Sequence, residues 1–433
     1  MSERQPERVP RRRLWVGIAG AVAIVALLAA SVAAAWTSVD EADDDPLSAP
    51  GGGGGTGGEG SAGDGSDGER SGGEPGPPAS EAEVRAAVDD ISAVVERERG
   101  LAFTQPVDVE LAGEGEFQRR LLDDFDEGVD ELRETEVLLK AFGLVEPDVD
   151  LVEAMRRLLG AGVVGFYDPE TDELVVRGTQ LTPYVRTTIA HELTHAIDDQ
   201  HFDLDRPEYD DADDEIGFGF TALVEGNARR VEDAYRAGLS EEEQLDAAAE
   251  ELSLGGDMDL GDVPLVLIDL ITAPYGLGQD FVVDLIDDEG QGALDAAFGA
   301  PPRTSEQVID PAAYEAGEAA IAVPPPDVAG QVVDTGTAGQ LLIQLVLANE
   351  LGADRARKAA AGWGGDAVVA WRDGQRPCAT LAAVGDDAGE TAELGSAFGD
   401  WAGEHGRGGA ATRPEVTIAP GGDGPVTVQS CAP

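Results

Sequence analysis

The sequence predicts an α+β protein that is predominantly helical. From about residue 80 onward, apolar residues recur every three or four positions in most segments, which is the periodicity of amphipathic helices. Only a few short stretches rich in Val, Ile, Thr and Tyr have the composition of strands, and each is flanked by turn residues. Residues 185–204 contain no Gly or Pro and predict the helix around which the other elements are arranged.

The charge balance is strongly negative, with 86 acidic and 29 basic residues among 433 and a formal net charge of −57. Such a charge repels nucleic acid, so we expect no nucleic-acid partner. Electrostatic screening shortens to about 3 Å near 1 M salt. The carboxylate-rich, lysine-poor composition is therefore typical of a halophilic protein that works in concentrated brine. An acid-rich protein from an ordinary habitat is the alternative. The length allows two or three domains.

The amino-terminal residues predict a membrane anchor. Residues 1–13 form a basic tail, and the uncharged run 14–36 would be about 34 Å long as a helix, enough to cross a bilayer core of about 30 Å. Trp15 and Trp36 lie near its ends, as interfacial aromatic residues do. Since arginines precede the run and acidic residues follow it, we expect a cytoplasmic amino terminus and an extracellular carboxyl-terminal part.

A cleaved signal peptide is the alternative interpretation of this run. Ala33 and Ala35 could form its cleavage site, although the run exceeds the usual apolar length of a signal peptide, about 7–15 residues. The rest of the chain is exported under both interpretations, anchored in one and secreted in the other.

Residues 37–79 are acidic and then rich in Gly and Ser. This composition cannot bury enough apolar surface to fold, so it predicts a disordered linker. We expect the ordered part to divide into a larger domain, 80–335, and an α+β portion, 336–433, that packs on it.

The first elements of the larger domain follow from periodicity and turn residues. A helix is expected at 80–99, a short strand at 107–111, and two or three helices within 116–159. Residues 163–167 and 173–177 are β-rich and enclose a turn, which predicts a hairpin. An edge strand there could pair with an extended peptide. The alternative is a purely structural hairpin.

The helix after the hairpin contains the motif His-Glu-x-x-His, formed by His191, Glu192 and His195. Residues four apart share one helix face, so both imidazoles can bind one metal ion. Two nitrogens from one rigid helix suit tetrahedral Zn²⁺ with an open position for water. Glu192 lies beside the histidines, where a general base belongs. The alternative is a surface helix with incidental histidines, but apolar neighbours predict that the pair is buried.

An acidic loop and a second helix follow the motif. The loop, 205–215, is expected to be solvated; a structural Ca²⁺ site is the alternative, although the spacing matches no EF-hand. The helix, 217–237, places Glu225 on an apolar face, where a carboxylate is costly unless it is paired or bound to a cation. Glu225 is therefore the expected third ligand of one Zn²⁺ per chain. The alternative is a salt bridge to Arg229 or Arg230.

Two further carboxylates are placed to support the ligands. Glu232 lies two turns beyond Glu225, and Asp199 lies one turn beyond His195. We expect them to hold the imidazole N–H groups of the metal-binding histidines.

The later elements are less regular in pattern. We expect helix from 240 to 289 with breaks at Gly255-Gly256 and Pro274, an irregular stretch at 303–314, a long apolar helix at 338–351, and strands at 368–371, 415–418 and 426–429. Cys378 and Cys431 are the only cysteines. In an exported domain they predict one disulfide, although two free buried thiols are the alternative.

These motifs together resemble a known family. The chain is similar to gluzincin-type zinc metallopeptidases, in which a downstream helical Glu joins His-Glu-x-x-His. More narrowly, it resembles exported His-Glu-x-x-His proteins of bacteria and halophilic archaea, which share Pro274-Tyr275-x-x-Gly278 and Gly362-Trp363-Gly364-Gly365-Asp366. In a third shared motif, Ser/Thr-x-Glu-Gln-x-x-His-Pro-x-x-Tyr, this chain has Asp310 where a His is expected.

The resemblance implies a zincin-like catalytic domain at 80–335 that hydrolyses peptide bonds, with Glu192 as general base and a peptide or protein as substrate. A further cationic or phenolic group usually assists such a reaction. The candidates are His201, Tyr275, Tyr314 and Arg229. Two other interpretations stay open: a catalytically inactive surface protein that keeps the fold, and a zinc hydrolase of non-peptide amides.

Overall fold

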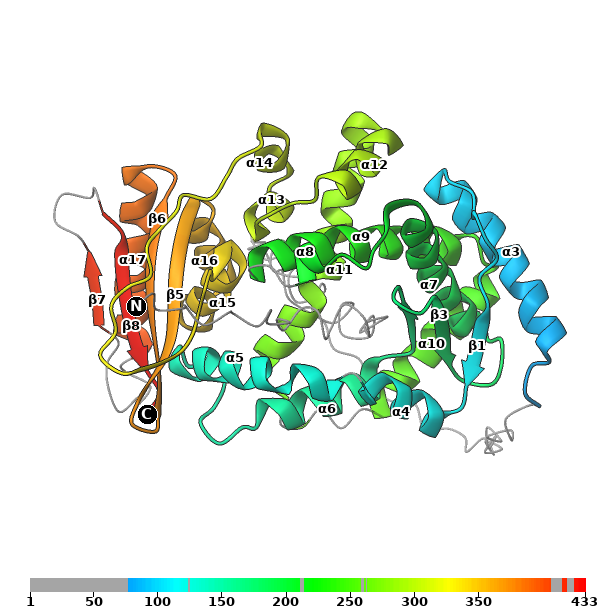
Figure 1. The fold of residues 1–433 in the computed structure, drawn as a ribbon, viewed down its shortest axis with the longest axis horizontal. Helices are drawn as coiled ribbons and strands as arrows, with labels where there is room; N and C mark the ends of the chain where they lie inside the picture. The colour runs from blue at the N-terminus through cyan, green and yellow to red at the C-terminus, as the bar shows by residue number, and fades with distance from the viewer. Residues whose placement is uncertain are drawn as a thin grey trace, which may run out of the picture.

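The computed structural model describes residues 77–123, 125–210, 214–257, 261, 263–405, 415–418 and 424–433. The predicted tail, membrane anchor and nearly all of the linker lie outside these residues. The molecule is elongated, with the carboxyl-terminal sheet at one end and helix α3 (Glu81–Arg99) at the other (Figure 1). It is α+β and mostly helical, as predicted.

The described chain begins with a run of helices, of which α5 (Val129–Ala141) also packs against the carboxyl-terminal sheet. Helix α3 begins with a capping box, in which Ser80 and Glu83 each hydrogen-bond the other's backbone N–H. The predicted two or three helices within 116–159 are confirmed as three: α4 (Glu114–Asp123), α5 and α6 (Leu151–Gly162). A single 3₁₀ turn, η1 (Phe125–Gly128), separates α4 from α5.

A three-stranded sheet follows in the order β1-β3-β2. The predicted hairpin is confirmed, with β2 (Gly165–Asp168) antiparallel to β3 (Glu173–Arg177). Strand β1 (Val109–Ala112) pairs in parallel with β3 and begins two residues later than predicted. Strand β2 forms one edge of this sheet and packs against the helix that follows the hairpin.

Three long helices build the centre of the molecule. Helix α7 (Pro183–Phe202) is surrounded by α3, α9 (Asp214–Ala237) and α10 (Glu241–Asp257), and α9 also packs on α11 (Leu265–Glu289). The predicted breaks at Gly255-Gly256 and Pro274 are wrong, since α10 includes the glycines and α11 continues through the proline. Packing of α11 against α9 outweighs the local cost of an interior proline.

Among the described helices, α11 alone is long and apolar enough to cross a membrane by length and composition. However, 56% of its most apolar window is buried inside the protein. This burial is expected of a core helix. Its apolar side chains join the largest hydrophobic cluster of the domain, together with residues of α6 and α9.

Residues 303–314 are not irregular as predicted. They form two short helices, α13 (Ser305–Ile309) and α14 (Pro311–Ala316), which follow α12 (Gln291–Gly299). Thr304 caps α13 and Asp310 caps α14 through side-chain hydrogen bonds to backbone N–H groups. The flanking prolines and short lengths hide the helical pattern in the sequence.

The carboxyl-terminal part is a five-stranded sheet, in the order β4-β5-β6-β8-β7, with helices on it (Figure 1). Its helix α15 (Gly339–Leu351) is confirmed, and β5 (Trp363–Asp373), β7 (Glu415–Ile418) and β8 (Val426–Cys431) contain the predicted strands. The sequence interpretation missed four further elements. They are β4 (Gln331–Gly336), α16 (Ala353–Ala360), β6 (Arg376–Gly385) and α17 (Ala388–His405).

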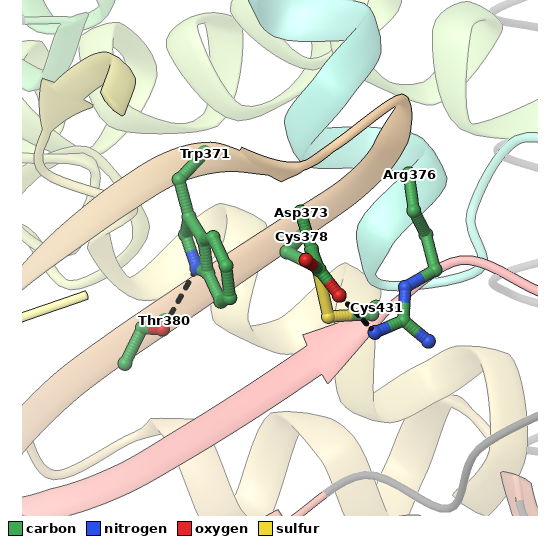
Figure 2. The surroundings of a disulfide bond; sticks show 6 residues. All are labelled: Trp371, Asp373, Arg376, Cys378, Thr380 and Cys431. Carbon is green, nitrogen blue, oxygen red and sulfur yellow. Dashed lines mark hydrogen bonds and ion pairs between the residues drawn. A yellow bond between two sulfur atoms is a disulfide. The ribbon is translucent and has the colours of Figure 1, made fainter. Parts of the chain in front are cut away.

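The predicted disulfide is confirmed between Cys378 of β6 and Cys431 of β8 (Figure 2). The two residues lie directly opposite each other in the antiparallel register of these strands. Beside the disulfide, the indole N–H of Trp371 donates a hydrogen bond to Thr380 across β5 and β6. The disulfide thereby fixes the last strand to the centre of the sheet.

Candidate metal centre

Helices α7 and α9 bring three potential metal ligands together. The carboxylate Oε2 of Glu225 lies 3.2 Å from Nε2 of His191 and 3.5 Å from Nε2 of His195. One ligand atom from each residue lies within 4.8 Å of the others, and all three residues are buried. This His₂Glu group could hold a metal ion, and two imidazoles with one carboxylate are a donor set that suits Zn²⁺.

No other group of three or more His, Cys, Asp or Glu residues in the described part of the chain has this property. The prediction that 205–215 is a solvated loop is wrong in part, because residues 207–210 form the short helix α8 (Pro207–Asp210) and the buried Glu215 belongs to α9. Residues 211–213 lie outside the described residues. The alternative of a Ca²⁺ site in that loop therefore stays a prediction.

Local sequence explains why α7 holds its two histidines firmly. The hydroxyl of Thr182 caps the helix by accepting from the N–H of Val185, and Pro183 occupies the first turn. Apolar residues lie on every side of the helix, so that nearly all side chains between 184 and 198 are buried. A helix packed all round cannot rotate to expose His191 and His195.

Two glycines bring α9 against α11 next to the third ligand. A Cβ atom added to Gly226 would lie 2.1 Å from the carbonyl carbon of Gly278, and one added to Gly278 would lie 2.0 Å from the carbonyl oxygen of Ala222. The two backbones are therefore in direct contact beside Glu225. This contact explains the glycine of the Pro274-Tyr275-x-x-Gly278 motif.

Tyr275 of the same motif lies against a metal ligand. Its ring stacks on the imidazole of His191, with centroids 6.2 Å apart and an interplanar angle of 26°. Tyr275 is 5% exposed. Of the four residues predicted to assist a reaction, Tyr275 is the one that directly contacts a ligand imidazole.

Glu232 holds His191 from the side opposite the metal group. Its Oε2 lies 3.1 Å from Nδ1 of His191, as expected of a residue that orients a ligand. Arg229 donates a 3.0 Å hydrogen bond to the other oxygen of Glu232, and Arg236 lies 3.5 Å from it. Burial alone would raise the pKa of Glu232, but Arg229 and His191 outweigh it and lower that pKa to about 2. The carboxylate is therefore ionised.

His191 itself has a carboxylate at each ring nitrogen. Burial disfavours its protonation, but the hydrogen bonds with Glu225 and Glu232 outweigh burial and raise the pKa of His191 to about 10. A divalent ion bound at Nε2 would replace the proton as the positive charge between these carboxylates. The two arginines that were the alternative partners of Glu225 contact other groups: Arg229 contacts Glu232, and Arg230 contacts Asn227.

Glu192 has a buried carboxylate without a partner. Both of its oxygens are inaccessible to water, and neither accepts a hydrogen bond. Gly165 of β2 makes room for it, because a Cβ added there would lie 3.0 Å from Oε1 of Glu192. Burial raises the pKa of Glu192 to about 7, against the opposing effect of His191 and His195. A buried unpaired carboxylate beside a His₂Glu group is positioned to exchange a proton with a molecule bound there.

The structure places the other predicted residues away from such roles. Asp199 accepts hydrogen bonds from the hydroxyl of Tyr167 and the N–H of Leu204, and it does not hold an imidazole. His201 contacts the carbonyl of Ala102. Tyr314 donates to the carbonyl of Ala300. Asp310, at the expected His position, is the exposed cap of α14.

A buried charged network behind the ligands escaped the sequence interpretation. The fully buried Arg99 of α3 binds Asp198, and Asp198 accepts a second hydrogen bond, 2.6 Å long, from Asn227. The guanidinium of Arg99 also lies beside the stacked rings of Phe202 and Phe298, 5.2 and 5.4 Å from their centroids. The network connects α7 and α9 two or three residues beyond their ligands. The only sequence signal was an arginine at the end of an amphipathic helix.

Comparison with known proteins adds one finding. A family described as a domain of unknown function (DUF8575) matches residues 327–429, which span the carboxyl-terminal sheet and its helices and none of the metal ligands. No curated protein and no solved structure matches the chain. We refer to residues 327–429 as the C-terminal domain.

Proposed function

We propose that this chain is a zinc-dependent hydrolase of peptide bonds that acts outside the cell. Zn²⁺ held by His191, His195 and Glu225 would supply a Lewis acid that polarises a carbonyl and makes water acidic near neutral pH. The observation that carries the proposal is the carboxylate of Glu192, which is buried, has no hydrogen-bond partner and lies beside the metal group.

The residues around the metal group would have distinct roles in the reaction. Glu192 accepts a proton from the attacking water and returns it to the leaving amine, since its oxygens have no other partner. Glu232, fixed by Arg229, holds Nδ1 of His191 so that Nε2 faces the metal group. Burial of these side chains keeps bulk water away from the proton transfer.

Strand β2 supports a peptide as the substrate. It is an edge of its sheet, and Gly165 at its start lies against Glu192. Three of the four residues of β2 are buried, so a local opening must first expose this edge. An extended peptide that then added to it would run past the carboxylate. The extracellular location is proposed from the basic tail and apolar run at 1–36, and the disulfide agrees with an oxidising compartment.

The test compares three forms of the purified chain in high salt. We expect about one zinc per chain in the wild type and in Glu192→Gln, and none in His195→Ala. Hydrolysis of a peptide library should occur with the wild type alone, because E192Q keeps the ligands but cannot accept the proton. Zinc loss in H195A with no hydrolysis by the wild type would instead favour an inactive zinc-binding surface protein. Absence of zinc in a folded wild type would overturn the metal site itself.

A further inference from the structure

The C-terminal domain meets the metal-ligand helix α9 at the first turn of α15. Asp366, the last residue of the Gly-Trp-Gly-Gly-Asp motif, accepts 2.9 Å hydrogen bonds from the N–H groups of Ala338 and Gly339 and from the indole N–H of Trp363. The N–H of Leu341, two residues after Gly339, donates to the hydroxyl of Ser305. The motif thus builds the beginning of α15.

Glu215 of α9 is seated against this turn. Its carboxylate accepts hydrogen bonds from the N–H and the hydroxyl of Ser305, 2.6 and 2.8 Å long. A Cβ added to Gly339, whose φ is +71°, would lie 2.0 Å from the same carboxylate. Only glycine adopts this φ easily and leaves the space. A negative charge at the amino-terminal end of a helix is also favoured by the helix dipole.

Glu215 and the third metal ligand belong to one helix. Glu225 lies ten residues further along α9, which is about 15 Å along a rigid helix axis. Gly219, one turn beyond Glu215, touches the carbonyl oxygen of Pro302, where an added Cβ would lie only 2.1 Å away. These contacts fix the position of α9 along its axis. Metal binding requires ligand distances within about 0.2 Å, so a small axial shift of α9 would displace Glu225.

We infer that the seat built by Ser305 of α13 together with Gly339 of the C-terminal domain positions Glu225 for metal binding, and that Glu215 is the positioning residue through which it does so. The seat for Glu215 consists of Ser305, Gly339 and the first turn of α15. This inference rests on the proposed zinc site, and it assigns a role to the region matched by the domain of unknown function.

The experiment measures zinc affinity of the full-length chain by competition with a chelator, at a temperature where every variant is folded. Glu215→Gln keeps the shape of the side chain and removes its charge, and should weaken zinc binding about tenfold or more. Ser305→Ala keeps the backbone N–H donor and should have a smaller effect in the same direction. Thr380→Val is the matched control, since it breaks a buried hydrogen bond to Trp371 within the C-terminal domain but contacts no part of α9.

The control separates positioning from general stability. All three variants should lower the melting temperature, and only E215Q and S305A should change the zinc affinity. Equal zinc affinity in E215Q, S305A and the wild type would overturn the inference while leaving the metal site intact. A wild type that binds no zinc would overturn the proposed function instead. If E215Q does not fold, the comparison of S305A with T380V decides the question alone.

Discussion

The backbone contact between α9 and α11 gives the sharpest test of how the metal group is assembled. A methyl group added by Gly226→Ala would lie 2.1 Å from a backbone carbon of Gly278, whereas ordinary contacts begin near 3.4 Å. The two helices must therefore separate by roughly 1 Å. Backbone atoms cannot rotate away as a side chain can, so the change reaches Glu225, the adjacent residue.

The magnitude follows from two opposing effects. Overpacking a close contact costs about 3 kcal/mol at the upper end of its usual range, and Ala is better than Gly inside a helix by about 1 kcal/mol. We expect G226A to lose about 2 kcal/mol of unfolding free energy and to bind less zinc. The matched control is Gly276→Ala on α11, which is exposed and has no atom within 4 Å of an added Cβ. It should gain up to about 1 kcal/mol.

Thermal or denaturant unfolding, together with zinc content, measures both variants. A G226A protein as stable as G276A, with a full complement of zinc, would refute the backbone contact and the account of how α9 is placed.

Two further predictions concern buried charges. Arg99→Met should lower the unfolding free energy by about 3–5 kcal/mol, because Asp198 would keep a buried charge without its partner; a loss below about 1 kcal/mol in denaturant unfolding would contradict this. Burial, together with the nearby Asp386 and other carboxylates, raises the pKa of Glu306 to about 8. Between the ordinary pKa of a glutamate and pH 8, the folded chain then binds one more proton than the unfolded chain. The free energy of unfolding therefore falls as the pH rises through this window. Glu306→Gln should flatten this part of the pH–melting temperature curve, and an unchanged slope would exclude Glu306 as its source.

Features carried by local spacing could be predicted from the sequence. His191 and His195 share a helix face because they are four residues apart. Glu225 could be predicted because a carboxylate on an apolar helix face requires an ion-pair partner or a bound cation. The sequence does not indicate which of Asp198 and Asp199 joins the buried network behind the metal ligands. Helix α7 is buried all round, so no amphipathic pattern indicates which of two neighbouring carboxylates faces which partner.

The composition of β6 and α17 explains why the sequence did not predict them. Strand β6 is rich in Ala and mostly buried, so it lacks the alternation that reveals a strand. Helix α17 contains four glycines, which resemble loop residues until packing is known. The opposite error occurred in α11, where Pro274 suggested a break that packing against α9 overrides.

The depth of the ligand group bears on rates of exchange. His191 is fully buried, Glu225 is 3% exposed and His195 is 7% exposed, so a chelator, like a substrate, reaches an ion held by them only through a local opening of the protein. Release then requires a local opening that separates α7 from α9, and its rate reports how often that opening occurs. Loading faces the same barrier, so the metal would enter most easily while the chain folds, before α7 and α9 pack together.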